Sequence, residues 1–123
     1  MKRIVVALGG NLILEAGHTA TFEEQVNDIE LRSRGIAYLV MQGHQVVVVH
    51  GNGPQVGASL IQNEEAAAVV PAMPLHNCVA QTQGQLGTML QLSLTNALRA
   101  VQIERPVVTL VTHTIVSQDD PAL

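Results

Sequence analysis

The chain has 123 residues, of which 47% are hydrophobic and 13% are charged, and its formal net charge is −4. This length provides for one hydrophobic core, and so little charge predicts either a well-covered sheet or a surface that another polypeptide covers. Scattered basic residues exclude the positive patch that nucleic acid or an anionic membrane requires.

The amino-terminal residues and the cysteine content indicate where the protein resides. The sequence starts with a short apolar stretch that is too short to span a membrane and has no cleavage site for export, so we expect a cytoplasmic protein. The single Cys78 excludes an internal disulfide, and one cysteine with five dispersed histidines predicts no metal site.

A strand, a helix and a second strand are predicted in the first fifty residues. Residues 4–8 are apolar, partly β-branched and followed by two glycines, which is typical of a strand buried on both faces. Thr21 and Glu24 form a capping-box pattern before a helical pattern that ends near Gly43. Four consecutive valines within residues 45–50 predict a second buried strand. This order predicts a βαβ unit with parallel strands.

Two further helices and a third strand are predicted in the rest of the chain. Pro54 suits a first helical position, and that helix continues toward the alanines at 66–68. Residues 77–101 carry leucines at intervals of mostly four, which predicts a long helix whose apolar stripe packs on the sheet or on another subunit. Residues 107–111 are typical of a third strand, and residues 117–121 of a polar turn.

Glycine-rich turns follow the first two predicted strands. Gly9, Gly10 and Asn11 follow the first, and residues 50–57, with the sequence HGNGPQVG, follow the second and lead into a helix. Open α/β sheets bind ligands at the carboxyl ends of their strands, and unpaired N–H groups at a helix N-terminus attract phosphate or carboxylate. These turns predict an anion site, with glycines that only permit a tight turn as the structural alternative.

The second turn also approaches a dinucleotide fingerprint. Gly51, Gly53 and Gly57 stand as G-x-G-x-x-x-G, but no strand followed by an acidic residue appears about twenty residues on, where a ribose would be held. The pattern therefore favours a small anion over a dinucleotide.

Together with residues 82–84, Gly87 and residues 120–122, these motifs resemble the amino-terminal portion of carbamate kinases in order and spacing. That family's members are well over twice as long as this chain. The resemblance implies an amino-acid-kinase-type fold, a three-layer α/β/α sandwich with a mainly parallel sheet, in which residues 1–123 are the acceptor-binding lobe. It also implies a homodimer and a reversible phosphoryl transfer from ATP to carbamate, which gives carbamoyl phosphate, in arginine breakdown.

The resemblance implies binding residues but assigns no catalytic residue. Carbamate or the transferred phosphoryl group is expected to bind at Gly9, Gly10, Asn11, Gly51, Asn52, Gly53, Gln83 and Gly84. Packing of the long helix explains Gln83 and Gly84 equally well. Phosphoryl transfer needs cations aimed at the moving group, and Lys2, the only lysine, stands at the wrong end of the first strand. The resemblance implies that the residues that bind ATP and Mg²⁺ lie outside this chain.

The sequence departs from the family pattern at Leu12, His113 and Ile115, where a small residue, a glutamine and a glutamate are usual. These departures leave open a different substrate or a decayed copy. Three hypotheses remain: half of a phosphotransferase that is inactive alone and is completed by a further lobe or a separate chain, a non-catalytic module that binds a small anion or nucleotide, and an interaction half that binds no ligand.

Overall fold

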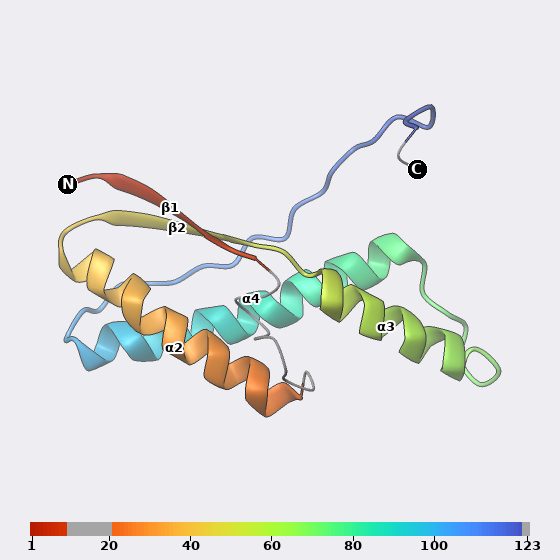
Figure 1. Ribbon diagram of the computed structural model, residues 1–123, viewed down its shortest axis with the longest axis horizontal. Helices are drawn as coiled ribbons and strands as arrows, with labels where there is room; N and C mark the ends of the chain where they lie inside the picture. The colour runs from red at the N-terminus through yellow and green to blue at the C-terminus, as the bar shows by residue number, and fades with distance from the viewer. Residues whose placement is uncertain (10–20, 122–123) are drawn as a thin grey trace.

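A computed structural model describes residues 1–9 and 21–121 of the chain. Gly10, Asn11 and Leu12, to which the sequence assigned expectations, lie outside the described residues. The elements in chain order are β1 (Arg3–Leu8), α2 (Phe22–Met41), β2 (Gln45–His50), α3 (Gly53–Ala66) and α4 (Leu75–Ala100) (Figure 1).

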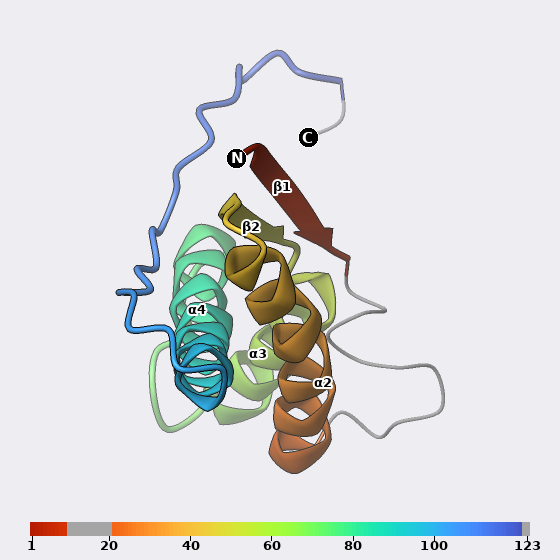
Figure 2. The ribbon, with the colours of Figure 1, turned by 90° about the vertical axis from the view of Figure 1, so that its left-hand side faces the viewer.

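The two strands form a parallel sheet. Arg3 lies opposite Gln45 and Leu8 lies opposite His50, so both strands end at the same edge. The helix α2 connects them, which confirms the predicted βαβ unit and the α/β class. Figure 2 shows the helices gathered on one face of this sheet. Within the described residues the fold therefore has a sheet layer and one helix layer.

Local signals set both ends of α2. The hydroxyl of Thr21 accepts a hydrogen bond from the Glu24 N–H at 3.2 Å, and the Glu24 carboxylate accepts one from the Thr21 N–H at 3.1 Å. Two N–H groups at the helix start thereby gain partners, as the capping-box pattern predicted. Gly43 follows the helix with a φ of 82°, a left-handed conformation that glycine adopts without a steric cost.

The core lies between the two long helices and the helix-facing side of the sheet. Its buried cluster consists of Leu8, Ile29, Ile36, Leu86, Met89, Leu90 and Leu94. The leucine stripe of α4 thus packs on α2 and the sheet within this chain, which decides between the two predicted uses of the stripe. The lone Cys78 is free and buried on the same helix.

The opposite face of the sheet is exposed. Val5, Val47 and Val49 expose 67%, 57% and 46% of their surface, while Val6 and Val48 on the same strands pack against the core. The expectation that both strands are buried on both faces is therefore wrong for this chain by itself. Alternate side chains of a strand point to opposite faces, and the described helices cover only one of them.

The predicted third strand at residues 107–111 is also wrong, because these residues are not in strand conformation and pair with neither β1 nor β2 in the described parts of the chain. They belong to residues 105–112, the α4-side segment, which follows α4 and runs back alongside it. Strand composition alone does not place a run in a sheet, since a neighbouring strand must lie within hydrogen-bonding distance. Among the described helices, none is long and apolar enough to cross a membrane.

Candidate functional site

The two glycine turns lie side by side at the carboxyl edge of the sheet. The Gly51 N–H donates a hydrogen bond of 3.2 Å to the carbonyl oxygen of Leu8, which continues the ladder beyond the last strand pair. Gly9 follows Leu8 directly, so the turns after β1 and β2 begin at adjacent backbone positions. This is the arrangement that the sequence predicted for an anion site shared by both turns.

The helix α3 begins at the second turn. Asn52 precedes it, and the carbonyl oxygen of Asn52 accepts the first intrahelical bond from the Val56 N–H at 2.9 Å. The N–H groups of the first helical turn, including those of Gly53 and Gln55, have no partner inside the helix, and Pro54 has no N–H to satisfy. The positive end of the α3 dipole therefore lies at the carboxyl edge of the sheet.

Open space adjoins three of the predicted glycines. A Cβ atom added at Gly9, Gly51 or Gly53 would meet no atom within 4 Å, and none of the three has a left-handed backbone. Their flexibility is therefore not needed to make the turns themselves. Glycine at these positions leaves room for a bound group to approach the backbone closely.

The side chain of Asn52 is directed to α4. Its amide nitrogen donates to the Val79 carbonyl oxygen at 3.2 Å and to the Thr82 hydroxyl at 2.9 Å. Both donor hydrogens are used, and Thr82 is buried with 3% of its surface exposed. In this structure Asn52 fixes the turn to α4. Its amide oxygen remains available as a hydrogen-bond acceptor.

Gln83 and Gly84 come directly after Thr82 on α4, near the same edge. The Gln83 amide nitrogen donates to the Thr112 carbonyl oxygen at 3.2 Å, and the Gln83 amide oxygen accepts from the Thr112 N–H at 2.9 Å. One side chain thus satisfies both backbone groups of Thr112, as a neighbouring strand would. Gly84 adjoins open space and accepts a hydrogen bond from the Thr88 hydroxyl at 2.8 Å. The packing explanation for Gln83 accounts for its contacts here.

Sequence reasoning missed the contact between Gly87 and Thr109. A Cβ atom at Gly87 would overlap the Thr109 methyl group, and the Thr109 hydroxyl donates to the Gly87 carbonyl oxygen at 2.9 Å. Gly87 therefore lets the α4-side segment touch the helix backbone. The available signal was the pair of glycines three residues apart, which places Gly84 and Gly87 on neighbouring positions of one helix face.

A buried glutamine pair, also missed, joins α3 to α2. The Gln55 amide nitrogen donates to the Gln25 amide oxygen at 2.9 Å, and both residues are buried. Gln55 occupies the first turn of α3, so this bond fixes the start of the helix relative to the core. The helix N-terminus at the carboxyl edge is held by contacts to α2 through Gln55 and to α4 through Asn52.

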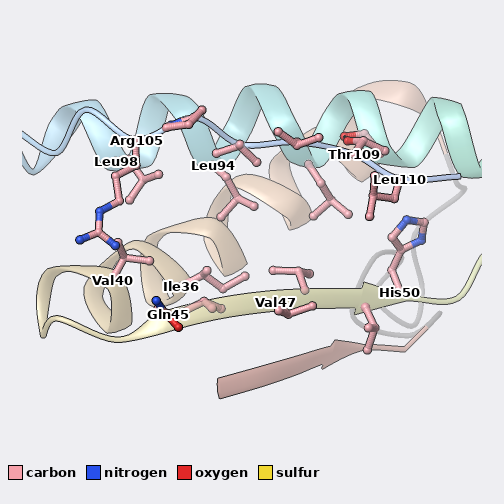
Figure 3. Close-up of a pocket in the computed structure, with 18 of the residues that line it drawn as sticks. Ile36, Val40, Gln45, Val47, His50, Leu94, Leu98, Arg105, Thr109 and Leu110 are labelled. Atoms are coloured by element: carbon pink, nitrogen blue, oxygen red, sulfur yellow. The ribbon is translucent and has the colours of Figure 1, made fainter. Parts of the chain in front are cut away.

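The cations of the chain lie away from this edge. All six lysines and arginines fall within the described residues: Lys2, Arg3, Arg32, Arg34, Arg99 and Arg105. Arg3 donates to the Gln45 side chain at 3.1 Å where both strands begin. Figure 3 shows Arg105 near this end of β2, whereas His50 is at the other end. In the part of the chain that is described, no lysine or arginine follows a strand directly or occupies the first turn of α3.

The carboxyl-terminal residues form the predicted polar turn. The Asp120 N–H bonds to the Ser117 carbonyl oxygen at 3.1 Å in an exposed turn. His113 and Ile115, two departures from the family pattern, are exposed, Ile115 by 97%. Over the residues that the structure covers, no group of three histidine, cysteine or acidic side chains could hold a metal ion.

The family model of the amino acid kinase family matches residues 2–120. The chain belongs to the amino acid kinase family. Its resemblance to carbamate kinases is confirmed: the Thermococcus kodakarensis carbamate kinase is 46% identical over 99% of this chain, and the Trichomonas vaginalis carbamate kinase is 49% identical over 98% of it. The carbamate kinase from Giardia lamblia bound to AMP-PNP has a TM-score of 0.92 and 40% identity over 98% of the chain.

This amino acid kinase chain spans about two-fifths of its relatives. The matches cover 40% of the Thermococcus protein, 38% of the Trichomonas protein and 38% of the Giardia chain. The fold therefore agrees with the amino-terminal part of carbamate kinases from β1 through the α4-side segment.

Proposed function

We propose that residues 1–123 form the acceptor-binding lobe of a carbamate kinase-type phosphotransferase, which converts ATP and carbamate to ADP and carbamoyl phosphate. The observation that carries this proposal is the pair of glycine turns joined by the Gly51–Leu8 hydrogen bond, with the N-terminus of α3 at the same edge. The similarity to carbamate kinases over nearly the whole chain supports it.

Carbamate suits the turns chemically. It is a small planar anion, and backbone N–H groups with a helix dipole stabilise negative charge without a cationic side chain. We assign this role to Gly9, Gly51 and Gly53 because open space adjoins each of them. Gly10 and Asn11, outside the described residues, are proposed as further members of the site. The side-chain oxygen of Asn52 is available to accept a hydrogen bond from the bound carbamate.

The chemistry of phosphoryl transfer requires more than this lobe. ATP and Mg²⁺ would bind the further three-fifths that the relatives carry, and AMP-PNP in the Giardia relative supports nucleotide use in the family. A single well-placed arginine contributes roughly 10³ to 10⁵ in rate to such reactions. Because the described cations lie away from the glycine turns, we expect the 123-residue chain to be inactive by itself.

Other expectations from the resemblance belong to the same proposal. We place the complete enzyme in the cytoplasm, in arginine breakdown and in a homodimer. A dimer would have to use a surface other than the leucine stripe of α4, because Leu86, Leu90 and Leu94 are buried within this chain.

Binding is tested by titrating the chain with carbamoyl phosphate while amide chemical shifts are recorded by NMR. We expect shifts at the Gly51 and Gly53 amides, and we expect Gly51→Ala and Gly53→Ala to weaken binding because each methyl group enters the ligand space. Gly35→Ala is the matched control, since its added methyl also meets no atom but lies on α2. Equal affinity in all three variants would contradict the assignment.

A non-catalytic anion-binding module is the second candidate, supported by the position of the cations away from the turns. Activity separates the two candidates. We expect no ATP formation from ADP and carbamoyl phosphate by the chain alone, and activity when the carboxyl-terminal three-fifths of the Thermococcus relative is fused after residue 121. A soluble fusion that binds both substrates but transfers no phosphoryl group would favour the module.

A further inference from the structure

The first turn of α3 is attached to α2 through the side chain of Gln55. Asn52 precedes α3, but its side chain caps no N–H group of the helix because it binds α4 instead. Gln55 is the third residue of the helix, and its amide nitrogen donates to the Gln25 amide oxygen of α2 at 2.9 Å. The direction of the N–H groups in this turn therefore depends on contacts with two other helices.

Gln25 is itself fixed at the start of α2. Its backbone N–H donates to the Thr21 carbonyl oxygen at 3.1 Å, and its side-chain nitrogen donates to the same oxygen at 3.4 Å. Thr21 is the capping residue of α2 and exchanges the two capping-box bonds with Glu24. A continuous series of hydrogen bonds therefore leads from the start of α2 to the start of α3, through the side chains of Gln25 and Gln55.

The two glutamines are buried, and one of them is incompletely paired. Gln25 and Gln55 expose 7% and 8% of their surface. The Gln55 amide oxygen is buried and accepts no hydrogen bond from the residues that the structure describes. An unpaired buried acceptor lowers stability, and two apolar side chains of the same shape can replace a buried polar pair at little or no cost. Stability alone therefore does not account for amides at both positions.

A hydrogen bond between the two amides provides a fixed direction, which an apolar contact does not. Gln55 is two residues after Gly53, so a rotation of the first turn of α3 redirects the Gly53 N–H as well. Hydrogen bonds weaken steeply when the donor hydrogen points away from the acceptor. The bond from Asn52 holds this turn to α4 on its own side, and the Gln25–Gln55 bond supplies the second attachment that prevents such a rotation.

We propose that Gln25 and Gln55 are positioning residues for the anion site, which hold the N–H groups of the first α3 turn in the direction that the bound acceptor requires. Neither side chain is assigned a contact with the ligand, since the free oxygen of Gln55 is buried. The inference rests on the proposed function, because carbamate or carbamoyl phosphate is the anion that these N–H groups would bind. It adds two residues, 30 positions apart in the sequence, on which affinity depends indirectly.

The orientation of the turn is tested without a ligand, by residual dipolar couplings of backbone amides in the 123-residue chain. The variant Gln25→Met with Gln55→Met keeps side-chain length and helix propensity but removes the bond. We expect the couplings of the Gly53 and Val56 amides to change and those of α2 to remain. Gln62→Met, at an exposed position of α3, is the matched control and should change neither set. Unchanged couplings at Gly53 and Val56 in the double variant overturn the proposal. Gln55→Met alone gives the same two outcomes if the double variant does not fold.

Thermal unfolding and titration with carbamoyl phosphate separate positioning from a structural role. Each single methionine variant should unfold at a lower temperature, because it leaves the partner amide buried without its bond, and the double variant should recover much of this loss. The double variant should nevertheless bind about tenfold or more weakly, which corresponds to one lost hydrogen bond to a charged ligand. Recovered stability with wild-type affinity overturns the proposal. Absence of binding by the wild-type chain would instead contradict the proposed function, and the dipolar couplings would then decide the role of the pair.

Discussion

The amide nitrogen of Asn52 lies 2.9 Å from the hydroxyl oxygen of Thr82, thirty residues later in the sequence. Because Asn52 immediately precedes α3 and Thr82 is in α4, this bond fixes the second glycine turn against the long helix. The same amide also binds the Val79 carbonyl oxygen. The geometry of the candidate site therefore depends on α4 as well as on the sheet.

Asn52→Ala should destabilise the chain by about 1–3 kcal/mol, because the partly buried acceptors on Val79 and Thr82 lose their donor. Urea unfolding followed by circular dichroism measures the change. Asn77→Ala is the matched control. Asn77 is exposed and its side-chain amide donates to the Met73 sulfur, so a change within about 0.5 kcal/mol is expected. Equal losses in the two variants would contradict a special role for Asn52.

Gly87→Ala and Gly84→Ala should have opposite effects although both lie on α4. The methyl group at position 87 overlaps Thr109, and overpacking of this kind costs about 1–3 kcal/mol. The methyl group at position 84 meets no atom, so the higher helix propensity of alanine should stabilise by about 0.5–1 kcal/mol. Thermal unfolding of both variants provides the comparison.

Thr109→Ser tests whether the clash is the cause. Serine keeps the hydroxyl that bonds to the Gly87 carbonyl oxygen but removes the methyl group that the new Cβ would overlap. The double variant Gly87→Ala with Thr109→Ser should therefore recover part of the lost stability. No recovery would indicate that the cost arises within α4 itself.

Capping of α2 provides a third prediction. Thr21→Ala should reduce stability by about 1 kcal/mol because the Glu24 N–H loses its side-chain acceptor. The loss should be smaller in a Glu24→Ala background, since the two bonds of the capping box depend on each other. Strictly additive losses in a double-mutant cycle would contradict this coupling.

The two faces of β2 should respond differently to the same substitution. Val48 packs against the core, so Val48→Thr should cost about 1–2 kcal/mol for the hydroxyl brought into that environment. Val47 is 57% exposed, so Val47→Thr should leave stability nearly unchanged and lower the tendency of the chain to self-associate. Urea unfolding and light scattering measure the two effects. Similar destabilisation by both substitutions would mean that the outer face is covered in solution.

Features that depend on local sequence could be predicted. The capping box at Thr21 and Glu24, the proline near the start of α3 and the leucine spacing of α4 each act within a few residues, and all three helices were expected near their observed positions. The parallel pairing of β1 and β2 also followed, because a βαβ connection leaves few alternatives.

Features that depend on distant partners could not be predicted. Residues 107–111 have strand composition but pair with neither β1 nor β2. Valines occur on both faces of β2, although the described helices cover only one of these faces. The two glycine turns were expected at one edge of the sheet, and they lie side by side there. The partners of Asn52 and Gln83, 30 and 29 residues away in the sequence, could not be read from it.

The length and continuity of α4 have a mechanical consequence. Its 26 residues form a single rod of about 39 Å at the usual helical rise, and Asn52 and Thr109 are attached to it little more than one turn apart, at Thr82 and Gly87. A rotation of the rod about its axis would pull on both attachments at once. The second glycine turn and the α4-side segment would then move together, so a displacement of one would displace the other.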